Sequence, residues 1–183
     1  MKLLFTLIVV LVLATTATKD NLQWGQANDG IQMALASSDP RSSELQISFR
    51  NTGARDVMLN LGSMLGNGKV QLPDRIEIMF ADGLGNTRLF KFADKKHSSV
   101  AGRLDDYVVP LRVNSTYTLT VTLDQFWCQD TNEFEIPLTR GANRLTAQFH
   151  GTGASHVSLD MPGIKLMNYW LGKVESNTLI LER

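Results

Sequence analysis

The residues best suited to chemistry are three histidines, His97, His150 and His156, and they are thinly spread. His150 and His156 flank a glycine-containing loop that would let the chain fold back, and two imidazoles with Asp160 could begin a zinc or copper site. The His-Glu-x-x-His pattern of a helical zinc site does not occur, and one histidine pair is not a full ligand set. The sequence therefore favours two surface histidines at the end of a strand, with metal binding as an alternative.

The serine and cysteine residues that could act as hydrolytic nucleophiles also lack the sequence motifs of catalytic sites. No Gly-x-Ser-x-Gly elbow occurs, and Ser155 and His156 are neighbours in sequence rather than residues brought together by a fold. The single cysteine, Cys128, has no recognisable catalytic neighbourhood and is expected to be a partly buried thiol. Asp105 and Asp106 would point to opposite faces of a strand, so we interpret them as a solvated turn. We predict that the protein is not an enzyme and uses no metal or cofactor.

Two apolar stretches remain as candidate contact surfaces. Phe126 and Trp127 follow an alternating segment and precede polar residues, which predicts a position at the end of a sandwich. The stretch 161–171, which includes Tyr169 and Trp170, is interrupted by proline and glycine. Its favoured interpretation is that it closes an open end of the core, since exposed apolar patches are uncommon. The alternative is an aromatic contact surface for a protein or glycan, formed by these four residues.

Alternation of apolar and polar residues dominates the chain after its first residues. It is clearest in 44–50, 75–80 and 116–123, where every second residue is apolar, and it predicts strands with one buried face. Weaker strands are predicted over six further ranges: 30–36, 56–61, 87–92, 106–111, 144–149 and 178–182. Turn-forming residues at 51–53, 66–68, 82–86 and 140–143 separate them. Seven to nine short strands with frequent turns predict one all-β domain, an antiparallel β-sandwich.

The segment 109–121 carries a family resemblance. A leucine, a turn and Tyr117 precede an alternating strand there, and this resembles the connection in fibronectin type III and other immunoglobulin-like domains. The resemblance implies an immunoglobulin-like sandwich in which the Tyr117 hydroxyl bonds to nearby backbone as a tyrosine corner. The strand, Asn-x-Gly, strand pattern in 45–57 is also similar to bacterial immunoglobulin-like modules, among them small proteinase inhibitors. The cysteine pair of true immunoglobulin domains is absent.

Residues 1–17 have the composition of a secretory signal peptide. Lys2 is followed by a run of twelve mainly apolar residues and then by small residues. A membrane span takes about 20 apolar residues, so this run is short for one. We predict cleavage near Ala17 and a secreted or periplasmic domain formed by 18–183. The alternative is an uncleaved segment that anchors the protein.

The charge balance narrows the partners. Without Lys2 the chain has 17 Lys and Arg against 18 Asp and Glu, a net charge of −1, and it contains no long basic block. Nucleic-acid binding requires a concentrated basic surface, so this class of partner is disfavoured. We predict an exported, non-enzymatic β-sandwich that recognises a protein or glycan. The alternatives are a proteinase inhibitor acting through the 82–86 or 129–132 loop, a metal-dependent enzyme, and a structural envelope protein.

Overall fold

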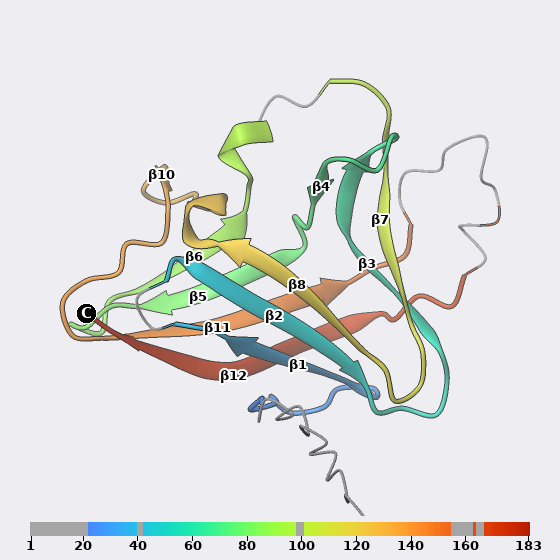
Figure 1. Cartoon of the computed structure of the whole chain (residues 1–183), viewed down its shortest axis with the longest axis horizontal. Coiled ribbons are helices and arrows are strands. Elements are labelled where there is room, and N and C mark those ends of the chain that lie inside the picture. Colours follow the sequence, from blue (N-terminus) through green and yellow to red (C-terminus); the bar gives the residue numbers. More distant parts are fainter. Residues whose placement is uncertain (1–21, 40–41, 98–100, 155–162, 164–166) are drawn as a thin grey trace, which may run out of the picture.

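The chain folds into antiparallel β-sheets (Figure 1). The computed structural model describes residues 22–39, 42–97, 101–154, 163 and 167–183. Within these ranges the regular elements are twelve strands and two short 3₁₀ helices, η1 (Lys95–His97) and η2 (Leu123–Gln125), which confirms the all-β class. No helix in these ranges is long and apolar enough to cross a membrane. The predicted signal peptide at 1–17 lies outside the described residues.

Three sheets make up the fold, and every strand pair in them is antiparallel. The first has the order β1-β2-β8 and contains β1 (Ile31–Ala36), β2 (Glu44–Asn51) and β8 (Thr116–Thr122). The second has the order β4-β3-β7 and contains β3 (Val57–Leu65), β4 (Gln71–Leu72) and β7 (Leu104–Leu111). The third has the order β10-β9-β6-β5-β11-β12 and contains β5 (Ile76–Ala81), β6 (Thr87–Phe92), β9 (Phe126–Cys128), β10 (Glu133–Phe134), β11 (Ala142–Gly151) and β12 (Gly172–Glu182).

All nine predicted strand ranges are strands in the structure, but the expected total of seven to nine is too low. The additional strands β4, β9 and β10 are two or three residues long. Alternation can be recognised only over several residues, so a strand of two or three residues gives no periodic signal in the sequence. Pairing of β4 with β3, of β9 with β6 and of β10 with β9 is what makes these segments strands.

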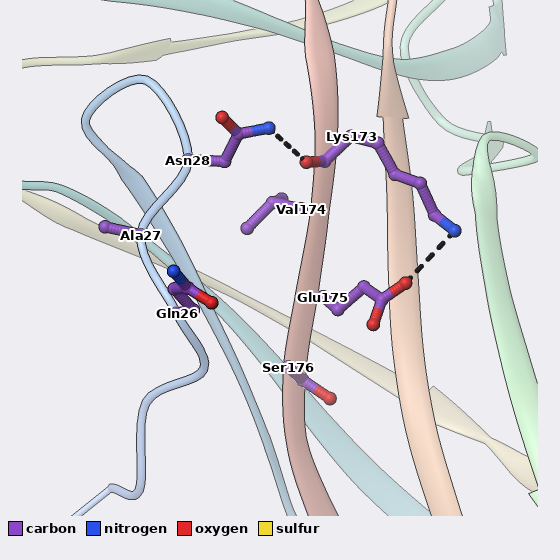
Figure 2. Close-up of a pocket in the computed structure, with 7 residues that line it drawn as sticks. All are labelled: Gln26, Ala27, Asn28, Lys173, Val174, Glu175 and Ser176. Atoms are coloured by element: carbon purple, nitrogen blue, oxygen red, sulfur yellow. Dashed lines mark hydrogen bonds and ion pairs between the residues drawn. The ribbon is translucent and has the colours of Figure 1, made fainter.

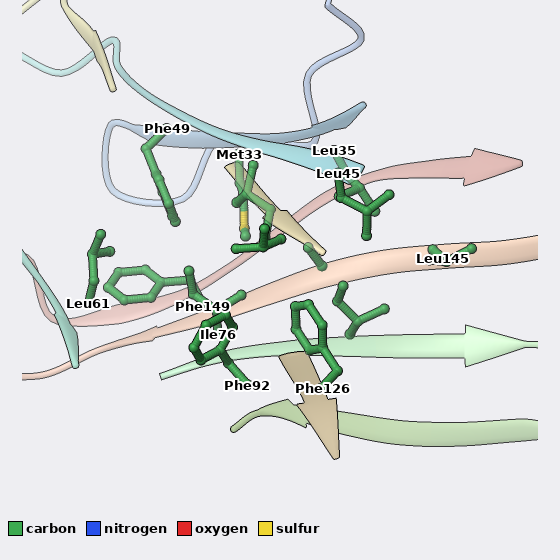
Figure 3. Close-up of a cluster of buried hydrophobic side chains, with 14 of the residues drawn as sticks. Met33, Leu35, Leu45, Phe49, Leu61, Ile76, Phe92, Phe126, Leu145 and Phe149 are labelled. Atoms are coloured by element: carbon green, nitrogen blue, oxygen red, sulfur yellow. The ribbon is translucent and has the colours of Figure 1, made fainter. Parts of the chain in front are cut away.

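The core lies between the six-stranded sheet and the β1-β2-β8 sheet, and aromatic rings join the two (Figure 3). Phe49 of β2 meets Phe149 of β11 edge-on, with 5.2 Å between ring centroids, and Phe149 stacks on Trp170 at 5.8 Å. All three side chains are essentially inaccessible to solvent. Such pairs contribute about 0.5–1.5 kcal/mol beyond the area they bury. Trp170 thus closes the core at the start of β12, as the favoured interpretation of its stretch predicted.

Tyr117 contributes to the packing between sheets in an unexpected way. The family resemblance implied a hydrogen bond from its hydroxyl to backbone, but its partner in the structure is the hydroxyl of Tyr107 on β7. Burial, reinforced by this bond, raises the pKa of Tyr107. The pair therefore joins β8 to β7, strands of two different sheets that are consecutive in the chain.

The edge strands β1 and β12 lie side by side and are bridged by one side chain. The Asn177 amide accepts a hydrogen bond from the Leu35 N–H at 2.8 Å and donates one to the Leu35 carbonyl at 3.1 Å. One residue earlier, the Ser176 hydroxyl accepts a bond from the Ala147 N–H, at a register shift between β11 and β12. The bulge turns the Asn177 side chain toward β1, where it replaces a backbone partner for Leu35.

We predict that Asn177→Ala lowers the free energy of unfolding by about 1–3 kcal/mol, because both Leu35 backbone groups lose their partner in a buried place. Urea unfolding followed by far-UV circular dichroism would measure the change. The matched control is Asn67→Ala, which removes an exposed amide bonded only to the Lys69 N–H of its own turn. A loss no larger than that of the control would mean that Asn177 does not hold the two edges together.

Candidate functional site

Two of the four predicted contact residues belong to the core. Phe126 is fully buried on the inner face of β9, and Trp170 is 2% exposed beneath Phe149. Strand alternation explains the burial of Phe126, since the neighbouring Trp127 must then face outward. The burial of Trp170 agrees with the favoured interpretation of its stretch, and the burial of both residues removes Phe126 and Trp170 from the alternative, an aromatic contact surface.

Tyr169 lies at the rim of a buried polar cluster. Asp106, 3% exposed, accepts a hydrogen bond from the Asn60 amide at 2.9 Å and lies 3.8 Å from the Arg75 guanidinium. Its second carboxylate oxygen and the Tyr169 hydroxyl are buried without a hydrogen-bond partner among the described residues. Burial, and then the charge of Asp106, raise the pKa of Tyr169.

This cluster corrects the expectation of a solvated turn at Asp105 and Asp106. Both residues are in β7, on opposite faces, and only Asp106 enters the interior. Asn60 and Arg75 also bond to the Gly153 carbonyl, at 3.1 and 3.5 Å. The cluster therefore ties β3, β7 and the end of β11 together around one buried carboxylate.

Trp127 projects from β9 on the side opposite to the buried Phe126 and Cys128, and so lies on the outer face of the six-stranded sheet. It pairs in register with Phe134 of β10, and the two rings lie 6.5 Å apart at 35°. The Trp127 ring N–H donates to the Asn132 side chain at 3.2 Å, which orients the indole. Both aromatic side chains are half-buried, so each ring keeps part of its surface open to solvent.

A row of polar side chains continues from Trp127 across the same face. The register places Lys91 beside Trp127, Glu77 beside Lys91, Gln148 beside Glu77, and Glu175 beside Gln148. Neighbouring strands are about 4.8 Å apart, so the five strands of this row span about 19 Å. The side chains in it supply both donors and acceptors of hydrogen bonds.

Charged partners fix part of this row. The Glu77 carboxylate lies 3.6 Å from the Lys91 ammonium and 3.5 Å from the His150 ring nitrogen. Lys95 of η1 lies over the Phe134 ring at 5.7 Å from its centroid. We name Trp127, Phe134, Lys91, Lys95 and Glu77 the aromatic face. It combines two flat apolar rings with cations at their border and a carboxylate beside them.

The predicted histidine pair is only partly within the described residues. His150 ends a strand and is exposed, as expected, and its charged neighbour is Glu77. His156 and Asp160 lie outside the described residues. Among the described residues, no three His, Cys, Asp or Glu side chains gather as metal ligands. Cys128 is a free thiol, fully buried in the core.

His97 forms a second polar pair, at the end of η1. Its Nδ1 lies 2.8 Å from the Asp94 carboxylate, which also accepts bonds from the Lys96 N–H and, at 3.5 Å, from the Gln125 amide. Burial opposes ionisation of Asp94, but the bonds from His97, Lys96 and Gln125 together outweigh it and lower its pKa. The pair holds η1 against η2 and so positions Lys95 over Phe134.

A polar groove of about 480 Å³ separates the N-terminal segment from β12 (Figure 2). The Asn28 amide donates to the Lys173 carbonyl at 2.6 Å and so ties the segment to the strand across this groove. Lys173 is paired with Glu175 at 3.0 Å. The groove thus results from docking of the N-terminal segment, with its charges already paired.

No family model matches this sequence, and no curated protein matches it. Interpretation of the site therefore depends on its geometry.

The sequence pointed to Trp127 but missed the residues around it. Phe134 and Lys91 are separated from Trp127 by seven and thirty-six positions, and only the β6-β9-β10 pairing brings the three together. Phe134 is isolated among polar residues in a two-residue strand, so no pattern marked it. The pairing of Phe134 with Trp127 across a short turn was the one signal that could have revealed it.

We predict that Asp94→Asn destabilises the protein at neutral pH by about 1 kcal/mol, because it removes the charge that His97 and Gln125 contact. The folded-state pKa of Asp94 lies below its ordinary value of 3.8, so its stabilising contribution is present above pH 3.8 and disappears as the pH falls through the folded-state pKa. Thermal unfolding at pH 7 and at pH 3 would measure the difference. Asp130→Asn, at an exposed position, is the control, and an equal effect of Asp94→Asn at both pH values would contradict the prediction.

Proposed function

We propose that the protein is an exported, non-enzymatic recognition module that binds a glycan on the aromatic face. The observation that carries this proposal is the pairing of Trp127 with Phe134 on the outer face of the six-stranded sheet. Flat aromatic surfaces at which one side is apolar and the ring N–H is polar suit amphipathic ligands. A sugar ring has such a character, with an apolar C–H face and hydroxyl groups around its edge.

The row beside the rings supports a glycan rather than a protein partner. Protein interfaces generally have a core depleted of charged residues, whereas Lys91 lies directly beside Trp127 in the register and Glu77 lies one strand further along. Lys91, Glu77 and Gln148 offer donors and acceptors at the spacing of the strands, suited to successive hydroxyl groups. A chain of sugars lying across the strands would contact aromatic rings at one end and hydrogen-bonding groups along the rest.

Export is the part of the proposal that derives from the sequence alone. What supports it is the composition of residues 1–17, where Lys2, an apolar run and small residues match a secretory signal peptide. An immunoglobulin-like identity is likewise proposed from the resemblance at 109–121, and the coarser statement, antiparallel sheets packed on a common core, is the one the structure establishes.

Trp127→Ala is expected to weaken glycan binding at least tenfold, since it removes the larger ring of the face. Affinity electrophoresis in gels containing xylan, galactomannan, pectin or mixed-linkage β-glucan would measure it, with pull-down on chitin and peptidoglycan for insoluble ligands. Trp24→Ala is the matched control, because the Trp24 ring is covered by the Arg50 guanidinium at 4.3 Å on a different sheet. Retention of full binding by Trp127→Ala, or no retardation in any gel, would reject the aromatic face as a glycan site.

A proteinase inhibitor is the second candidate function, favoured by the loop between β5 and β6. Leu84 at its tip is 89% exposed. The Asp82 carboxylate holds the loop by accepting bonds from the Leu84 N–H, the Asn86 N–H and the Asn86 amide, each at 2.9 Å. A rigid loop that presents one apolar side chain suits the specificity pocket of a protease, because little conformational entropy is lost on binding.

For this candidate we predict that Leu84→Asp abolishes inhibition of any protease that the wild-type protein inhibits, while Leu104→Asp, at another exposed leucine, leaves it intact. Titration against a panel of serine, cysteine and metalloproteases would give inhibition constants for the three proteins. Equal loss in both variants, or no inhibition by the wild type, would remove this function from consideration.

A further inference from the structure

The strand β8 leaves one of its edges unpaired in the described part of the structure. It bonds only to β2, because the sheet order is β1-β2-β8. The bonds just beyond the strand show which residues face β2: the Leu123 N–H donates to Ser43, and the Ser115 carbonyl accepts from Asn51. Since bonding alternates along an antiparallel strand, the backbone groups of Thr118 and Thr120 point to the open edge.

Thr122, the next residue along the open edge of β8, confirms that these backbone groups point away from β2. The Thr122 N–H, in the same phase as Thr118 and Thr120, points away from β2 and donates to the Gln125 side chain at 2.8 Å. Gln125 thus ends the open edge on one side. Thr120 is exposed, so its N–H and carbonyl lie at the surface rather than beneath another element.

A second open edge lies opposite, across a groove of about 380 Å³ lined by Leu119, Thr120 and Val121 on one wall and by 68–71 on the other. The strand β4 on that wall bonds only to β3. Val70, just before the strand, and Leu72 face β3, so the Gln71 backbone groups face away from β3. The floor is closed by Phe92 and by the Asp94–His97–Gln125 group. The groove is therefore a trough with strand edges along both sides.

The exposed charge beside this trough is positive. Lys69 lines the trough. Lys96 is exposed and stands in the sequence between Asp94 and His97, which both line it. Asp94 is buried and its carboxylate is already bonded to His97, so it offers little charge to a ligand. Asp94 is the only carboxylate among the described residues that line the trough.

We propose that this trough is a peptide-binding site in which an extended, acidic segment of a partner protein adds as a strand to the edge of β8. Main-chain hydrogen bonds to Thr118 and Thr120 supply affinity, as in other cases of strand addition. Lys69 and Lys96 select acidic side chains, which alternate along the peptide on one face. The site is separate from the aromatic face, which lies on the outer side of the six-stranded sheet.

An array of ten-residue peptides that alternate glutamate with valine, threonine or phenylalanine would test the site, read by fluorescence polarisation with the purified protein. The best binder is expected to lose at least tenfold in affinity when alternate backbone amides are N-methylated, and again when its glutamates are replaced by lysine. Its binding should also slow hydrogen exchange of the Thr118 and Thr120 amides. No binding in the array, or equal binding by the N-methylated peptide, would overturn the proposal.

Variants of the protein locate the site independently. Lys69→Glu/Lys96→Glu should weaken binding at least fivefold, while Arg55→Glu, in the loop between β2 and β3 and not among the residues that line the trough, should leave it unchanged. Thr120→Pro removes an N–H that bonds to no other strand of the described structure, and it should weaken binding by a similar factor. The midpoint of urea unfolding would confirm that this variant still folds. The Thr118 and Thr120 amides could also exchange hydrogen slowly in the protein without any peptide, and exchange faster when the protein is diluted. That result would show that a second copy of the chain pairs with β8, and it would overturn the proposal for a partner peptide.

Discussion

The edge-to-face contact between Phe49 and Phe149, extended by the stacking of Trp170, is the packing interaction on which the rest of the structure depends. It joins β2 of the β1-β2-β8 sheet to β11, which is the neighbour of the edge strand β12 in the six-stranded sheet, and the stacked Trp170 lies just before β12. Interdigitated aromatic rings admit few alternative arrangements, because interiors are close-packed and a shift opens a void.

With the inner faces packed against each other, the six-stranded sheet has an outer face on which Trp127 and Phe134 keep part of their surface exposed. The alternation of β9 divides its residues accordingly: Phe126 and Cys128 enter the core, and Trp127 remains outside. The same packing that buries two predicted contact residues therefore exposes the third. The aromatic face is a consequence of where the core lies, and the residues beside Trp127 come from strands that the core brings into register.

The edges of the sheets differ in whether side chains pair with their backbone groups. Between β1 and β12 a side chain, Asn177, supplies the hydrogen bonds that a neighbouring strand would provide. Between β8 and β4 the edges are left open, with lysines at the rim. Open edges invite pairing with other chains, and charged residues are the usual protection against it. The lysines of the trough both discourage indiscriminate pairing and select an acidic strand.

The sequence by itself determined the all-β class and nine of the strands, because alternation is a local consequence of one buried face and needs no knowledge of the partner strand. It also marked Trp127 as a contact candidate. Only the tertiary structure decided that Phe126 and Trp170 are buried, that Asp106 enters a polar cluster, and that Phe134 and Lys91 meet Trp127. These outcomes depend on which strands pair and which face meets the core, and pairing is set by contacts between residues far apart in the chain, which local periodicity does not encode.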